Sequence, residues 1–182
     1  MNQIASRRPD PNDVGTAYQS AVDQLEGDCA VSVMQEQMYW LCELASSLSV
    51  EQLDKIHAPY TWSIRQVFEH CANAERAFGY RLMRIAAGDQ TNLPPWDENA
   101  YADCRFGLGN FTHIITELGD LRRANVMLLR RIKPAAWDNV GYVHEKPILL
   151  RTIAWITAGH LHHHLLIVEQ RCGITANRRP PM

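Results

Sequence analysis

The chain has 182 residues, 46% of them hydrophobic, and its 18 Lys and Arg residues against 20 Asp and Glu residues give a net charge of −2. This length suits one domain whose core needs no disulfide or metal staple. The balanced charge and a pI of about 6.4 argue against a nucleic-acid partner, which requires a basic face. No run approaches the roughly 18 apolar residues of a membrane span, so we expect no membrane partner.

The ends of the chain and its cysteines point to an intracellular helical domain. Residues 1–15 contain arginines but no apolar segment behind them, so we predict a disordered leader rather than a secretory signal. The helical domain is expected at 16–173 and a flexible tail at 174–182. The five cysteines are odd in number, widely spaced and without a C-x-x-C pair, which is typical of reduced thiols in the cytoplasm. Each lies on or beside an apolar stripe and is expected to be a small core residue.

Apolar residues recur at steps of three and four along the first half of the chain, which predicts helices. A short helical segment at about 17–25 precedes a long one at about 28–48. A second long helix begins at Ser63, because Ser63 and Gln66 have the spacing of a capping box. It stops at Gly88, where glycine suits a left-handed position.

Apolar residues also recur at helical spacing in the second half of the chain. A third long helix is predicted at about 108–132 and a fourth at about 149–172. Connections of roughly 15 to 20 residues are long for helix joints, so the run at 93–98 is expected to cover a site. No segment shows convincing strand alternation. The pattern therefore predicts an all-α four-helix bundle with long interhelical connections, a common place for a metal site.

Four of the eight histidines lie within five positions of the predicted fourth helix. His160 and His164 are one turn apart on one face, with Cβ atoms about 5–6 Å apart, so two imidazoles can meet one ion. His162 projects about 200° away and is expected at the surface. His163 flanks the pair and is a candidate for supporting the ligands or for contacting a substrate. The run is internal and flanked by apolar sequence, which excludes an expression tag.

A third ligand must come from another helix, and four histidines are available. His57 and His144 lie in predicted loops, and His113 lies near the start of the third helix. His70 is the best candidate, because it lies two turns into the second helix among apolar residues. A lone histidine there is more often a hydrogen-bonded core residue than a ligand, so the pattern alone leaves both interpretations open.

Two stretches carry a resemblance to a known family. One is 60–70, which reads Tyr-Thr-Trp-Ser-Ile-Arg-Gln-Val-Phe-Glu-His, and the other is 158–165, where histidines follow Ala158-Gly159. Shorter matches lie at 74–76, 80–81, 85–89, 93–94 and 96–98. Over about 18–173 the sequence resembles the DinB-like (DinB/YfiT-like) family.

The resemblance implies a four-helix bundle of unusual connectivity, often dimeric, with a metal ion held by three histidines. Matched residue by residue, these are His70, His160 and His164, and all three are present. The resemblance also makes Glu75 a candidate for supporting the ligands, with a salt bridge on the helix surface as the alternative.

Two further residues near the expected cover of the site are candidates. Asp97 is a candidate for a hydrogen bond to a ligand imidazole or to the covering loop, and a plain turn residue is the alternative. Trp62, Trp96 and Trp155 are expected to pack in the core, with Trp96 also a candidate for lining the pocket.

Three neutral imidazoles suit zinc, nickel, cobalt or iron(II), and three protein ligands with an open position form the catalytic pattern. An ion of this kind activates a bound water or thiol. Proteins similar to this one include thiol S-transferases, thiol-dependent isomerases and possible metal-dependent hydrolases.

We therefore predict a divalent-metal-dependent enzyme of S-transferase or hydrolase type, with an unknown catalytic group. The expected cofactors are one zinc or nickel ion and a low-molecular-weight thiol. The expected partners are a small-molecule substrate and a second copy in a cytoplasmic homodimer. The alternative is a non-catalytic metal-binding or stress-response module. A DNA-repair role, suggested by the family's damage-inducible name, has no support in the charge pattern.

Overall fold

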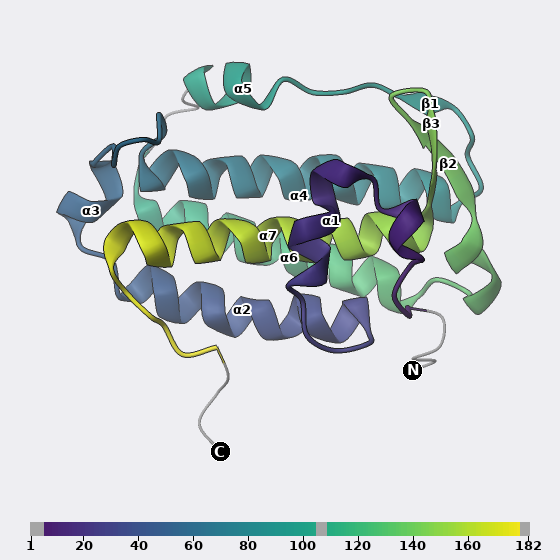
Figure 1. The fold of residues 1–182 in the computed structure, drawn as a ribbon, viewed down its shortest axis with the longest axis horizontal. Coiled ribbons are helices and arrows are strands. Elements are labelled where there is room, and N and C mark those ends of the chain that lie inside the picture. Colours follow the sequence, from purple (N-terminus) through teal and green to yellow (C-terminus); the bar gives the residue numbers. More distant parts are fainter. Residues whose placement is uncertain (1–5, 105–108, 179–182) are drawn as a thin grey trace.

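The computed structural model describes residues 6–104 and 109–178. Four long helices form a bundle: α2 (Ala30–Ser46), α4 (Ile64–Ala86), α6 (Phe111–Arg130) and α7 (Leu150–Cys172) (Figure 1). Their ends fall within three residues of the predicted ones where both are described. The predicted start of the third helix at Leu108, and the outermost parts of the predicted leader and tail, lie outside the described residues.

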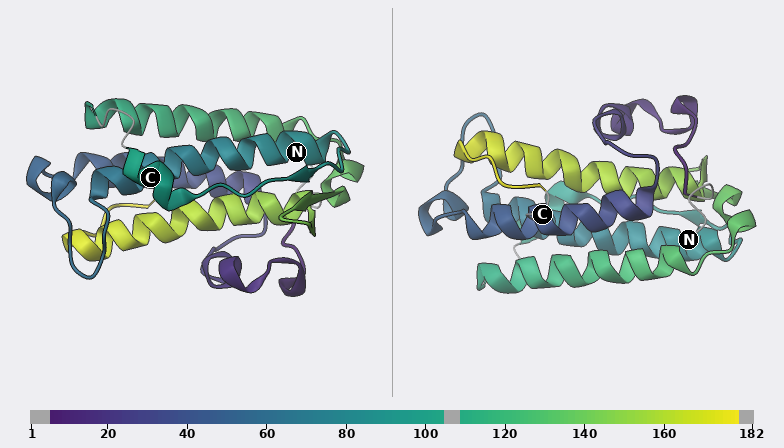
Figure 2. Two further views of the ribbon diagram at one scale, coloured as in Figure 1. Left: turned by 90° about the horizontal axis from the view of Figure 1, so that it is seen from above. Right: turned by 90° about the horizontal axis from the view of Figure 1, so that it is seen from below.

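Of the four long helices, α4 and α6 are consecutive and adjacent, whereas α2 and α4 are consecutive along the chain but do not pack together. Both α2 and α4 pack against α6 and α7, so α2 and α4 lie across the bundle from each other (Figure 2). This connectivity requires long links, because the chain must cross an end of the bundle between α2 and α4. The predicted all-α four-helix bundle with long connections is confirmed.

The helix α7 is the most enclosed of the four. Its buried side chains lie on every side of the helix, because α2, α4 and the short helix α1 (Thr16–Asp23) all cover it. Gly159 makes the contact with α1 possible, since a Cβ atom there would lie 3.1 Å from the backbone carbonyl of Ala21. Residues from the predicted leader also reach α7: the indole Nε1 of Trp155 donates to the carbonyls of Ser6 and Arg7, each at 3.0 Å.

A small sheet lies at one end of the bundle, and its strands were not recognised in the sequence. The strands β1 (Asn92–Leu93), β2 (Val140–Val143) and β3 (Lys146–Leu149) lie in that order, with β1 parallel and β3 antiparallel to β2. Strands of two to four residues are too short to show alternation. The β2–β3 turn, at His144 and Glu145, has positive φ at both residues, as in a tight hairpin.

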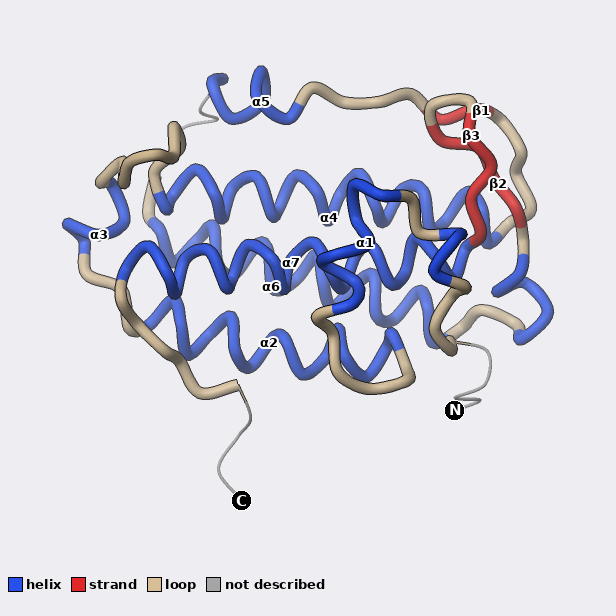
Figure 3. Tube along the Cα trace, viewed as in Figure 1, coloured by secondary structure: helices blue, strands red, loops and turns tan. Residues whose placement is uncertain are grey.

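The long connections contain further short elements, which Figure 3 separates from the loops. They are the helices α3 (Val50–Asp54) and α5 (Glu98–Cys104) and a 3-10 turn at Pro134–Asp138, and a further 3-10 turn at Pro11–Asp13 precedes α1. The α5 helix is tied to α4 because the Gln66 amide donates to the carbonyl of Ala102 at 3.2 Å. The connection between α4 and α6 therefore lies over the side of α4.

The cysteines follow the prediction only in part. All five are free thiols, and Cys29 and Cys71 are buried, whereas Cys42 and Cys104 are exposed rather than in the core. Cys42 lies on α2 and Cys104 ends α5, and helical spacing alone does not show that neither side chain is covered. Across the described part of the chain, no helix combines the length and apolar character needed to cross a bilayer.

Candidate metal centre

The position of His70 is set by the start of α4. The Ser63 hydroxyl accepts from the backbone N–H of Gln66, and the Gln66 side chain accepts from that of Ser63, which confirms the predicted capping box. This cap satisfies backbone donors that the first turn of a helix leaves unpaired. His70 follows on the face of α4 that meets α7 and is only 3% exposed.

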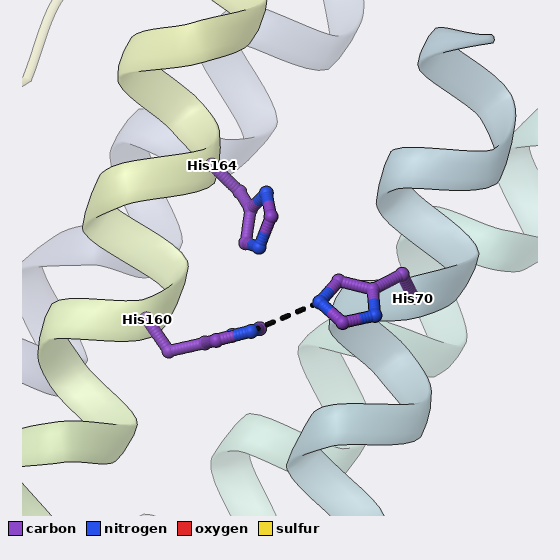
Figure 4. Close-up of side chains that lie close together, drawn as sticks. All are labelled: His70, His160 and His164. Carbon is purple, nitrogen blue, oxygen red and sulfur yellow. Dashed lines mark hydrogen bonds between the residues drawn. The ribbon is translucent and has the colours of Figure 1, made fainter. Parts of the chain in front are cut away.

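His160 and His164 lie in the middle of α7, one turn apart as predicted. Gly173 ends the helix in a left-handed conformation, with φ of 63°. Both histidines lie on the side of α7 that faces α4, where His70 meets them (Figure 4). The predicted association of His70 with this pair is therefore present in the fold.

The three rings converge on one point between the two helices (Figure 4). The Nε2 atoms of His70 and His160 are 3.0 Å apart, and one nitrogen from each of the three residues lies within 4.8 Å of the others. The ring centroids of His164 are 4.8 Å from those of His70 and 4.6 Å from those of His160. Such a group could hold one metal ion, and no other group of three metal-binding side chains is found among the described residues.

The surroundings keep these imidazoles neutral. Burial lowers the pKa of His70 to about 4. The pKa of His160 lies far below its usual range because of burial, the neighbouring histidines and the Arg122 guanidinium. The pKa of His164 is likewise lowered, by burial and by the nearby His70 and His163. The buried Nδ1 of His70 has no hydrogen-bond partner among the described residues. At neutral pH the rings therefore present lone pairs rather than charges.

Aromatic rings enclose the cluster on the α4 side. Trp96 stacks on His70, with centroids 5.5 Å apart and planes 14° apart, so the run at 93–98 does cover the site. Trp62 lies 5.0 Å from the same ring, although we expected it only in the core. Phe78 contacts His160 at 5.4 Å and was not predicted. Its sequence signal is its position two helical turns after His70, on the same face of α4.

One side of the cluster opens to a cavity of about 340 Å³ that reaches His164. Tyr60, Trp62, Asn99 and Arg171 also line it. The Arg171 guanidinium lies 4.6 Å above the ring of Tyr60 and donates to the carbonyl of Trp62. Neither Tyr60 nor Arg171 was singled out, because they become neighbours only through the loop before α4.

The remaining predicted site residues have different environments. Glu75 is buried rather than on the surface: its carboxylate pairs with Arg122 at 2.8 Å and accepts from Asn125 at 2.7 Å. Burial raises the pKa of Glu75, and Arg122 opposes this. Asp97 accepts from the backbone N–H groups of Asn99 and Ala100. It therefore acts as a turn residue, which was the alternative to a hydrogen bond with a ligand imidazole.

The other histidines lie apart from the three-ring cluster. His163 is exposed, and its ring contacts that of His164 at 5.2 Å. His162 was expected at the surface, but it is half-buried against Trp40, 5.1 Å between centroids, because α2 covers that side of α7. His57, His113 and His144 are not part of the group.

Comparison with known proteins agrees with this fold. The structure is similar to that of YfiT from Bacillus subtilis, with a TM-score of 0.71 and 21% sequence identity, covering 80% of this chain and 87% of that one. YfiT is described as "a probable metal-dependent hydrolase with an unusual four-helix bundle topology". No curated protein matches the chain.

The sequence resemblance is also confirmed. Residues 40–168 match the model of the DinB superfamily, a stretch that covers most of the chain and contains all three clustered histidines. The chain belongs to the DinB superfamily.

Proposed function

We propose that this chain is a divalent-metal-dependent enzyme, in which His70, His160 and His164 bind one ion and a small molecule reacts beside it. The observation that carries the proposal is the convergence of three neutral imidazoles from two helices, with no carboxylate in the group. Imidazole nitrogens suit zinc, nickel, cobalt and iron(II). The description of YfiT as a probable metal-dependent hydrolase supports the same class of function.

The geometry of the rings fits one ion. Two nitrogens bound to one ion at about 2.0–2.1 Å lie roughly 3.0–3.4 Å apart. The Nε2 atoms of His70 and His160 are already at 3.0 Å, and a ring nitrogen of His164 lies within 4.8 Å of the ligand atoms of both. Without an ion, two buried imidazole nitrogens face each other at hydrogen-bond distance, and at most one proton can lie between them.

A bound divalent ion supplies a Lewis acid at the inner end of the cavity beside His164. Three protein ligands leave coordination room for a substrate group, since a catalytic site keeps a position open. Trp62 and Trp96 pack on His70, keep water away from its ring faces and fix its orientation. The Arg171 side chain in the same cavity offers N–H groups to a substrate. We propose a hydrolysis or a thiol S-transfer as the reaction type.

Metal content tests the ligand set. We expect about one divalent metal per chain in the untagged parent by elemental analysis, with zinc or nickel as the predicted element, and far less in His70→Ala. The matched control is His163→Ala, which removes an exposed histidine next to a proposed ligand and is expected to keep the metal. Equal metal content in the parent and in His70→Ala would show that His70 is not a ligand.

Activity tests whether the site is catalytic. The metal-loaded protein is incubated with low-molecular-weight thiols and either a halogenated aromatic compound or an epoxide, and separately with a panel of hydrolysable esters, amides and phosphoesters. We expect one of the two activities, abolished in His70→Ala and retained in His163→Ala. Neither activity in the metal-loaded parent would favour a non-catalytic metal-binding or stress-response module. The predicted homodimer is tested on the same preparation by light scattering.

A further inference from the structure

A second cavity, of about 560 Å³, lies between α1, the β2–β3 hairpin and the helices α4 and α7. Figure 1 shows α1 lying across the bundle, over α7. This cavity shares no lining residue with the one that reaches His164. Phe78 lines this cavity, and its ring also contacts that of His160. The cavity is therefore a neighbour of the histidine cluster and not its entrance.

The walls of this cavity combine apolar side chains with one buried cation. Phe78, Ile153 and Ile156 form an apolar surface, and Arg81 lines the cavity while being only 8% exposed. The volume lies within the range of about 300–1,000 Å³ that is usual for small-molecule sites. A ligand with an apolar body would bury hydrocarbon against these three side chains.

The Arg81 guanidinium has few partners among the described residues. Of its five N–H donors, one reaches the carbonyl of Pro94 at 3.3 Å. The guanidinium also lies 5.9 Å from the ring of Phe78 and close enough to Tyr18 to lower the pKa of that phenol against the effect of its burial. It forms no salt bridge with any described residue, although Asp13 lies at the same cavity. Buried charges are normally paired, so this cation lacks the anion that such an environment requires.

The other polar groups at the cavity also favour an anion. Lys146 and His144 line it from the hairpin, and Tyr18 lines it from α1, against the single carboxylate of Asp13. A planar guanidinium matches a carboxylate with two parallel hydrogen bonds, and such pairs are stronger than neutral ones.

We propose that this cavity binds an organic carboxylate. The anionic group pairs with Arg81, and the apolar body lies against Phe78, Ile153 and Ile156. This site goes beyond the proposed metal-dependent reaction and does not depend on it, because no proposed metal ligand lines the cavity.

Calorimetric titration tests the site with 4-phenylbutyrate and with its neutral analogue 4-phenylbutanamide. Metal-free protein is used, so that the carboxylate cannot bind through a metal ion, and a repeat with the metal-loaded protein is expected to give the same affinity ratio. We expect the acid to bind about tenfold more tightly than the amide, because a buried charge-assisted pair is lost with the amide. Equal affinities, or no binding of the acid, would overturn the proposal.

The Arg81→Gln variant tests whether the Arg81 side chain causes the preference for the acid over the amide. We expect acid and amide to bind equally weakly to it. Arg123→Gln, at an exposed arginine paired with Asp120 on α6, is the matched control and is expected to retain the tenfold preference. Unchanged binding of the acid to Arg81→Gln would refute the role of the guanidinium.

Thermal unfolding separates a ligand-binding role from a structural one. Without ligand, we expect Arg81→Gln to unfold at the same temperature as the parent or above it, since the change removes an unpaired buried charge. A lower unfolding temperature would indicate that Arg81 serves to hold the segment at Pro94. In that case the acid–amide comparison on the parent still decides whether the cavity binds carboxylates.

Discussion

Two polar clusters that share α4 differ in how their groups are satisfied. The helix α4 contributes His70 to one and Glu75 to the other. In the second cluster, Glu75 is an anion paired with the Arg122 cation at 2.8 Å, and Asn125 donates to the same carboxylate. In the first cluster, three imidazoles meet and no carboxylate joins them.

The Glu75 cluster contains an anion and a cation that pair with each other, whereas the histidine cluster offers the lone pairs of three imidazoles to a ligand. Arg122 also donates to the carbonyl of Thr157 at 3.3 Å, although its Nε and Nη1 have no partners among the described residues. The charges of the Glu75 cluster nevertheless cancel inside the protein. In the histidine cluster the rings are neutral and the buried Nδ1 of His70 has no partner among the described residues, which is why the proposed metal site lies here.

The largest expected effect comes from breaking the compensated pair. Glu75→Ala leaves the fully buried Arg122 without its anion and should lower the free energy of unfolding by about 3–5 kcal/mol, measured by chemical denaturation of the metal-free protein. The double variant Glu75→Leu, Arg122→Met removes both charges and should recover most of that loss. A loss below about 1 kcal/mol in Glu75→Ala would contradict the view that the pair is needed for stability.

The histidine cluster should instead make the metal-free protein sensitive to acid. His70 titrates at about pH 4 in the folded protein, because it is buried, and near 6.5 when unfolded. Between these values the unfolded chain binds more protons, so stability is full above pH 6.5 and falls as the pH drops towards 4. For His70 alone the loss is about 3 kcal/mol at pH 4, of which about 2 kcal/mol is reached at pH 5. Denaturation curves at pH 7.5 and pH 5 measure it.

Two variants identify the source of this acid sensitivity. His70→Gln should reduce the difference between pH 7.5 and pH 5, since one buried imidazole is gone. His113→Gln, at an exposed histidine outside the cluster, should leave the parent's difference unchanged. The same pH dependence in all three proteins would show that the buried ring of His70 is not responsible.

Metal binding should stabilise the first cluster by a similar amount. A ligand that binds only the folded state at about 100 times its Kd adds roughly 2.7 kcal/mol to the free energy of unfolding. We expect this gain on adding zinc to the metal-free parent, and its loss in His164→Ala, with calorimetric unfolding as the measurement. A zinc-induced gain of the same size in His164→Ala would remove that residue from the proposed ligand set.

The sequence predicted the two helices of the site well because their signals are local. Ser63 and Gln66 mark the start of α4, Gly173 marks the end of α7, and the spacing of His160 and His164 places them on one face. The meeting of α4 with α7 is not local: the apolar pattern made His70 the best of four candidates but left a core histidine as the alternative, and the family resemblance matched it as a ligand. The resemblance could do so because both histidine motifs lie within the matched region.

What could not be predicted depends on contacts between distant segments. Periodicity does not show that Arg122, 47 positions after Glu75 along the chain, lies within 2.8 Å of it, so Glu75 was given a surface salt bridge as its alternative. The short strands and the ring of Trp62 against His70 were missed for the same reason. His162 was placed at the surface by the helical angle alone, which does not reveal that α2 covers that side of α7.

The smallest expected effect concerns the aromatic cover of the histidine cluster. Trp96 stacks on His70 and restricts that ring to the orientation that meets His160, whereas leucine would leave it freer. Because such ring contacts contribute about 1 kcal/mol, Trp96→Leu should weaken zinc binding about fivefold in a competition with a chromophoric chelator. Tyr80→Leu, which changes an exposed aromatic residue on α4, should not alter the affinity. If both variants bound zinc like the parent, the orientation of His70 would be set by the backbone of α4 alone, and Trp96 would serve only to cover the core.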